Sequence, residues 1–156
     1  MCDYSLMAVP NRLAVPGDDL VIHQFQTGCL GMAAARDLQA KRERRKEQGL
    51  WPGLKEFFRQ GPGIPAVCIP PGSHLIVRDI PQNLQRQCGL RSHTGEAVFT
   101  QLAVQAGTFR DAVRFNNGTE VLLQRFAKGQ RVRVLSVSSD EQETAPEYSG
   151  ISMRTA

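Results

Sequence analysis

The feature that most limits how this chain can fold is the stretch AVRFNNGTEVLLQRF at residues 112–126. Its Asn-Gly pair at 117–118 stands between two runs of β-forming residues, and Asn-Gly favours the primed turns whose twist matches that of a β-hairpin. A second turn, Lys-Gly-Gln at 128–130, leads into the strand-like run RVRVLSV. The sequence therefore predicts three antiparallel strands in succession at this end of the chain.

Shorter β-type runs occur along the rest of the chain, several of them just after a glycine-containing turn. They lie at residues 4–9, 20–25, 65–69, 73–77 and 96–104. Because the exposed edges of strands invite aggregation, a set of this kind is usually closed into a barrel or packed as two sheets. We therefore expect a mainly β fold, a small antiparallel barrel or sandwich of six to eight strands.

One segment departs from the β pattern. Residues 33–60 contain many strong helix formers, with Gly49 typical of a helix end and Pro52 typical of the start of a second short helix. We expect an α-helical insertion at about residues 33–60 within a single β domain of residues 1–137. Apolar positions in the first helix are sparse, so we expect that helix to dock weakly and to expose its basic face.

Charge is unevenly distributed along the chain, whose formal net charge is +4. Residues 33–47 contain six cations against three carboxylates, whereas residues 138–156 contain four carboxylates against one arginine. The latter residues have no hydrophobic periodicity, and we expect them to form a flexible acidic tail. The six cations of the insertion are Arg36, Lys41, Arg42, Arg44, Arg45 and Lys46.

Cys2 is the first candidate for chemistry. Removal of Met1 would leave its thiol beside a free amine, and an unperturbed thiol titrates near ~8.5. The Met-Cys start is similar to that of class II glutamine amidotransferases, but Asp3 stands where those enzymes have glycine, and the chain is short for their fold. A small apolar residue that anchors the first strand is the favoured interpretation. A thiol- or metal-dependent enzyme that uses Cys2 with Cys68 and a nearby histidine is the alternative.

Two cysteines and two histidines make up a second candidate, because two thiolates and two imidazoles suit a tetrahedral zinc site. A competing set combines Cys2, His23 and Cys29. Neither set has regular ligand spacing, so buried core cysteines and surface histidines are the simpler interpretation. None of the four cysteines forms a CxxC pair, which favours free thiols or ligands over a disulfide framework. The candidate zinc ligands are Cys68, His74, Cys88 and His93.

The basic helix is the third candidate. Lysine and arginine on one exposed helix could neutralise phosphates, which would make weak nucleic-acid binding strongly salt-dependent. Glu43 and Glu47 interleave with these cations, however, as in an ordinary solvated helix. No aromatic residue interleaves with the cluster, so base stacking has little support. We favour contact with a protein partner, or with another copy of the chain through its acidic tail.

Three stretches carry a resemblance to known proteins: MCDYSL at the start, AVC with the following Pro-Gly turn at 66–72, and RFNNGTEVLLQRFAKGQRVRVL near the end. They resemble a group of small uncharacterised bacterial proteins that begin with the same six residues. The resemblance implies a bacterial β domain and no particular activity. It does not extend to residues 33–60, so the insertion would be a feature of this chain.

The apolar runs are shorter than the ~18 to 20 residues that span a bilayer, and the first residues lack the pattern of a signal peptide. We therefore expect a cytoplasmic location. Taken with the uneven charge, the sequence predicts a non-enzymatic binding or accessory protein. Its exposed basic insertion would contact a protein partner or another copy of the chain.

Overall fold

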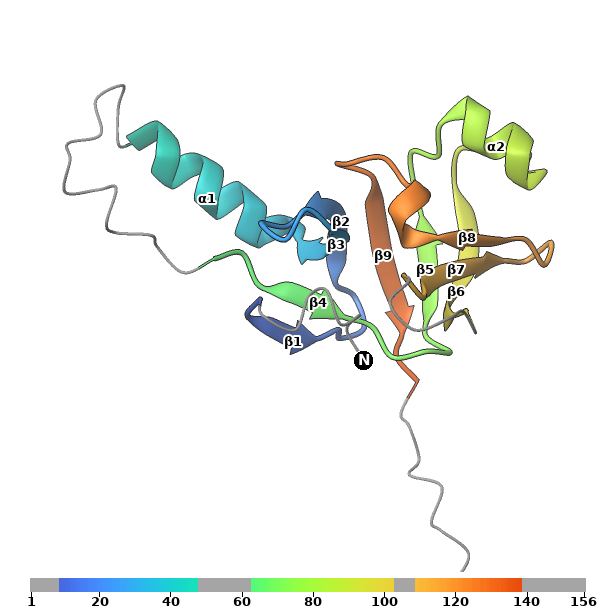
Figure 1. The fold of residues 1–156 in the computed structure, drawn as a ribbon, viewed down its shortest axis with the longest axis horizontal. Helices are drawn as coiled ribbons and strands as arrows, with labels where there is room; N and C mark the ends of the chain where they lie inside the picture. Colours follow the sequence, from blue (N-terminus) through green and yellow to red (C-terminus); the bar gives the residue numbers. More distant parts are fainter. Residues whose placement is uncertain (1–8, 48–62, 103–108, 139–156) are drawn as a thin grey trace, which may run out of the picture.

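The computed structural model describes residues 9–47, 63–102 and 109–138, and within them it contains nine strands, two α-helices and a short 3-10 helix (Figure 1). The strands are β1 (Asn11–Leu13), β2 (Asp19–Gln24), β3 (Leu30–Ala34), β4 (Ala66–Cys68), β5 (His74–Val77), β6 (Gly95–Gln101), β7 (Asp111–Phe115), β8 (Glu120–Leu122) and β9 (Arg131–Ser136). The helices are α1 (Ala35–Glu47), α2 (Gln82–Cys88) and the 3-10 helix η2 (Leu123–Arg125).

All nine described strands belong to one mixed sheet in the order β1-β4-β3-β2-β9-β5-β6-β7-β8. The mainly β class is thus confirmed. The sheet does not close into the expected barrel, because β1 and β8 lie at its two ends and are not neighbours. Nor is it wholly antiparallel, since β1 runs parallel to β4. A parallel edge pair of this kind joins segments distant in the sequence, so it leaves no local turn signal.

The predicted hairpin forms between β7 and β8. At its turn the Phe115 amide donates to the Thr119 carbonyl at 2.9 Å and the Gly118 amide donates to the Phe115 carbonyl at 2.8 Å. Gly118 has φ of +84°, which only glycine adopts readily. The prediction that the next strand pairs directly beside this hairpin is wrong. Strand β9 instead inserts between β2 and β5, in the middle of the sheet.

The helix η2 is responsible for this change of path, because it carries the chain out of the hairpin. It is tied to β3 by Gln124, whose side chain accepts from the Leu30 amide at 3.0 Å and donates to the Leu30 carbonyl at 2.8 Å. The Gln124 side chain thus bonds both backbone polar groups of Leu30, as a neighbouring strand would. They place the turn at 127–130, and hence the start of β9, beside β2.

The helical insertion begins two residues later than expected. Leu30–Ala34 forms strand β3, which is almost fully buried, and the helix starts at Ala35. Helix α2 lies outside the predicted insertion and was not expected. It follows Pro81 and ends before Gly89, which has φ of +63°. The rest of the predicted insertion, residues 4–8 of the strand expected at 4–9, and the expected acidic tail from residue 139 lie outside the described residues.

The main core is one cluster of buried side chains contributed by strands along the sheet, and it includes the fully buried Leu20, Leu75 and Val113. A smaller cluster sits under the start of α1, where Phe25, Ala33, Ile64 and Ala66 are buried. Leu38 of α1 packs against this second cluster and so helps to hold the helix on the sheet.

An ion pair fixes β1 against the turn that precedes β2. Arg12 Nη1 and Nη2 donate to the Asp18 carboxylate at 2.7 and 3.0 Å. Burial raises the pKa of Asp18, but hydrogen bonds from Arg12 and from the Val15 amide hold it below its usual value overall. Within the described part of the chain, neither helix has the length and apolar character that crossing a membrane requires.

Candidate binding groove

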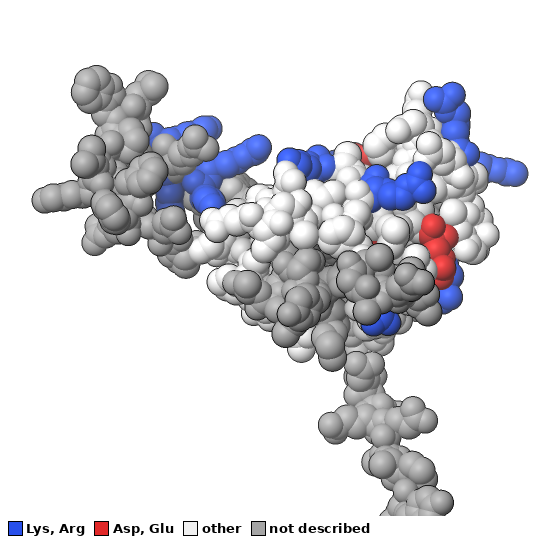
Figure 2. Space-filling view, in the orientation of Figure 1, with Lys and Arg blue, Asp and Glu red and all other residues white. Residues whose placement is uncertain are grey.

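An open groove of about 980 Å³ lies between α1, β2 and the turn that leads into β9. Basic side chains from three elements line it, and Figure 2 shows lysine and arginine atoms over α1 and over the adjoining part of the sheet. We call it the basic groove. Its cationic residues are Lys41, Arg42 and Lys46 of α1, Lys128 of the turn and Arg131 of β9.

One wall of the basic groove is α1, which follows β3 without an intervening loop and contacts both β2 and β3. Residues three, four, seven or eight apart share one face of a helix. Leu38, which attaches the helix to the sheet, therefore shares its face with Lys41, Arg42 and Lys46. The same docking contact that partly buries Leu38 turns these cations toward the groove.

The opposite wall is the turn at 127–130, which is hydrogen-bonded to the middle of β2. The Gly129 amide donates to the Ile22 carbonyl at 2.8 Å, and the Ile22 amide donates to the Gln130 carbonyl at 2.9 Å. Gly129 has φ of +86°, so the tight turn depends on glycine at this position. These contacts hold Lys128 beside β2 and across the groove from α1.

The basic groove carries more positive charge than its neighbours neutralise. Among the described residues, Lys41, Arg42, Lys46 and Lys128 form no ion pair. Glu43 is the one carboxylate in the lining, and it accepts a hydrogen bond from Gln39 at 3.1 Å. The apolar part of the lining is small: Val21, Ala35 and Leu38 are partly exposed, whereas Ile22 and Ile64 are only 1% and 9% exposed. The groove therefore combines unpaired cations with a strip of aliphatic surface.

His23 of β2 also lines the basic groove. Its ring meets that of Phe25 edge to face, with the ring centres 5.0 Å apart. Burial lowers the pKa of His23, and the charges of Lys41 and Lys128 lower it further. The imidazole is therefore neutral at pH 7. Its pKa depends on the charges of Lys41 on one wall of the groove and Lys128 on the other.

A smaller cavity of about 220 Å³ adjoins the basic groove and shares Val21, Ala35 and Arg131 with it. Two of its three arginines form ion pairs, and Arg78 forms none among the described residues. Arg131 donates to Asp79 at 2.7 Å, and Arg133 donates to Asp19 at 3.3 Å. The unpaired positive charge is thus concentrated more in the basic groove than in this second cavity.

The predicted basic residues are only partly brought together. Lys41, Arg42 and Lys46 line the groove. Arg36 is exposed and lies 3.9 Å from Asp37, and Arg44 is exposed outside the groove lining. The side chain of Arg45 lies outside the described residues.

The sequence does not indicate the wall of the groove that lies opposite α1. Lys128 and Arg131 are distant from α1 in the sequence, and nothing in the local pattern KGQRVR indicates that β9 inserts beside β2. The sequence suggests His23 as a metal ligand with Cys2 and Cys29 and does not indicate that it lies beside α1. A prediction of strand order would have been needed to place these residues opposite the helix.

The four predicted zinc ligands are not brought together. Cys68 is buried in β4, Cys88 is buried at the end of α2, and His74 and His93 are exposed. No group of three or more His, Cys, Asp or Glu in the described ranges is placed to hold a metal ion. The competing set of Cys2, His23 and Cys29 stays a prediction, because it includes a residue outside the described ranges. Cys2 itself lies outside the described residues.

The state of the thiols also differs from the expectation of free cysteines. Cys68 is disulfide-bonded, so its sulfur is not available as a nucleophile or a metal ligand in this state. Cys29 and Cys88 carry free thiols, and burial raises the pKa of the Cys88 thiol. A raised pKa keeps Cys88 protonated and poorly nucleophilic at neutral pH.

Comparisons of the chain with models of protein families, with curated proteins and with solved structures found no match. The function must therefore be inferred from the geometry and charge of the basic groove.

Proposed function

We propose that the protein is a binding module that holds an acidic segment of another polypeptide in the basic groove. The observation that supports this most strongly is the convergence of four cations without ion-pair partners among the described residues. Cations held on facing walls repel one another. Carboxylates placed between them would relieve that repulsion and form charge-assisted hydrogen bonds.

The aliphatic strip favours a polypeptide over a nucleic acid. Val21, Leu38 and Ile64 line the groove beside the cations, so an acidic segment with interspersed apolar side chains uses both surfaces. A nucleic-acid backbone would engage the cations alone. The described lining also contains no phenylalanine, tyrosine or tryptophan on which bases could stack.

The expected affinity is low. Each exposed ion pair contributes about 0 to 1 kcal/mol, so four such pairs contribute at most about 4 kcal/mol, which together with a small apolar contact corresponds to a dissociation constant of about 0.1 to 1 mM. Binding through exposed charges is also screened by salt, over a distance of about 10 Å at 0.1 M ionic strength. We therefore expect binding that is reversible and weakens as salt is added.

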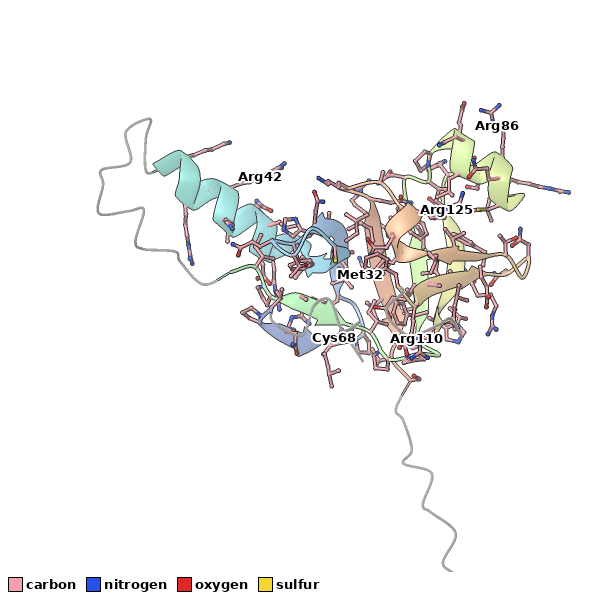
Figure 3. The ribbon with its side chains drawn as sticks, in the orientation of Figure 1. Met32, Arg42, Cys68, Arg86, Arg110 and Arg125 are labelled. Atoms are coloured by element: carbon pink, nitrogen blue, oxygen red, sulfur yellow. The ribbon has the colours of Figure 1, made fainter. Side chains whose placement is uncertain are left out.

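Fluorescence anisotropy with a labelled peptide of alternating glutamate and leucine tests the proposal. The groove variant carries Lys41→Gln, Arg42→Gln and Lys46→Gln. The control variant removes the same charge at three exposed arginines outside the groove lining, through Arg86→Gln, Arg91→Gln and Arg125→Gln; Figure 3 labels Arg86 and Arg125. We expect the groove variant to bind at least about 10-fold more weakly, a loss of ~1.4 kcal/mol, and the control variant to bind like the wild type.

Two results would contradict the proposal. Equal loss of affinity in both variants would mean that net charge, not the groove, attracts the peptide. Tighter binding of duplex or single-stranded DNA than of the peptide, with the same dependence on the groove cations, would instead support the nucleic-acid alternative.

A further inference from the structure

We infer that the acidic segment held in the basic groove belongs to a second copy of this chain, and that it is the stretch 140–147. The inference rests on the proposed function, and it names the partner. We call these residues the acidic stretch; its carboxylates are Asp140, Glu141, Glu143 and Glu147.

The acidic stretch matches the groove in kind and in number. It supplies four carboxylates, and the groove supplies four cations without ion-pair partners among the described residues. Apolar side chains lie next to the carboxylates, at Pro146 within the stretch and at Tyr148 and Ile151 just after it. They are suited to the aliphatic strip formed by Val21, Leu38 and Ile64. Both surfaces of the groove thus have a counterpart in this part of the sequence.

The point from which the acidic stretch departs is fixed by hydrogen bonds. The Ser138 amide donates to Ser73 Oγ at 3.2 Å, and the Ser138 hydroxyl donates to the Pro71 carbonyl. Ser73 is itself buried and donates to the Pro70 carbonyl at 2.7 Å. Figure 1 shows that the chain leaves β9 at the end of the strand away from α1. The acidic stretch therefore starts at the far end of β9 from the basic groove.

Chain length then decides between the groove of the same copy and that of another. Arg131 lines the groove and Ser138 follows it by seven residues, which along an extended strand is about 23 Å. From Ser138, Glu143 is five residues further on and can reach at most ~18 Å at full extension. Asp140 and Glu141 reach less far. The backbone at three of the four carboxylate residues therefore cannot reach Arg131 of the same copy, so the stretch cannot lie along its own groove as a unit.

A second copy has no such restriction, because its acidic stretch can approach the groove from solvent. Two copies that exchange their stretches reciprocally form a closed dimer, and each groove is then completed by residues of the other copy. The contact is mainly electrostatic, so association should weaken between low and high salt.

Complementation between two full-length variants tests the inference. The tail variant carries Asp140→Asn, Glu141→Gln, Glu143→Gln and Glu147→Gln, and it keeps its groove. The groove variant keeps its acidic stretch. Sedimentation velocity at ~0.1 mM protein and ~0.05 M salt should show self-association of the wild type and of the control variant, and monomers for the tail and groove variants alone. Their equimolar mixture should form a heterodimer, because one intact groove meets one intact stretch.

Each other outcome overturns the inference. A monomeric wild type, variants that still self-associate alone, or a mixture that stays monomeric would each show that the stretch does not bind in a second copy. The glutamate–leucine peptide separates this failure from failure of the proposed function. If the peptide binds the wild type but the copies do not associate, the groove binds acidic segments of a different protein. If the peptide does not bind, both proposals fail.

Discussion

At the scale of single residues, the charge of the basic groove depends on which side chains are ionised. Lys41 and Lys128 are cations at neutral pH, whereas His23 is neutral because burial and these two lysines lower its pKa. His23 therefore adds a further cation to the groove only when the pH falls. An occupant that brings carboxylates reverses the local field and favours the protonated imidazole.

The pKa of His23 can be followed by an NMR titration of its ring protons. We expect a value below the ordinary value of about 6.5 in the wild type, and a higher value after Lys41→Gln, which removes one nearby cation. Lys46→Gln is the matched control, because its charge is not among those that lower this pKa. A His23 pKa that responds equally to both substitutions would contradict the described geometry.

The same lowered pKa gives two pH dependences of opposite sign. Without an occupant, the unfolded chain binds a proton at His23 more readily than the folded chain does, so the free energy of unfolding falls as the pH drops below about 6.5. With an acidic occupant the proton is taken up on binding. Affinity for the glutamate–leucine peptide should therefore rise over the same pH interval.

At the scale of elements, α1 is a polar helix held to the sheet by very little apolar surface. Leu38 is its contact with the cluster of Phe25, Ala33, Ile64 and Ala66. The sparse apolar positions of the sequence predict this weak docking. Because Leu38 shares a helix face with the groove cations, loosening of the helix would also disperse the positive charge of the groove.

We expect Leu38→Ala to weaken the docking of α1 by about 1 to 2 kcal/mol, less than the loss at a fully buried leucine, because Leu38 is only partly buried. Amide hydrogen exchange should become faster along α1 and stay unchanged in β5, β6 and β7. Arg44→Ala, at an exposed position of the same helix outside the groove lining, is the control. Unchanged exchange in α1 after Leu38→Ala would show that another contact attaches the helix.

Elements specified by local residues were predicted well, and those specified by distant contacts were not. The hairpin around Gly118 depends on its own turn residues, so the sequence predicts it directly. Strand β3 has the composition LGMAA, which favours a helix, yet it forms a strand because it is buried between β2 and β4. Helix α2 has seven residues, too few to show a hydrophobic period.

At the scale of the whole molecule, the insertion of β9 between β2 and β5 determines where the groove forms. The cations of α1 could be predicted from composition alone. Lys128 and His23 could not be assigned to the same site, because only the pairing of distant strands brings them beside the helix. The basic groove thus lies at the start of β9, and the acidic stretch follows the end of the same strand in the sequence.

The central claim is that an acidic segment binds between α1, β2 and the turn at 127–130. The most direct test is a titration of the nitrogen-15-labelled tail variant with the glutamate–leucine peptide, followed by NMR, because no acidic stretch then competes. We expect the amide signals of β2, α1 and residues 127–131 to shift together and those of α2 and the β7–β8 turn to stay in place. Shifts concentrated at α2 or at β8, or no shifts at peptide concentrations of about 1 mM, would contradict the claim.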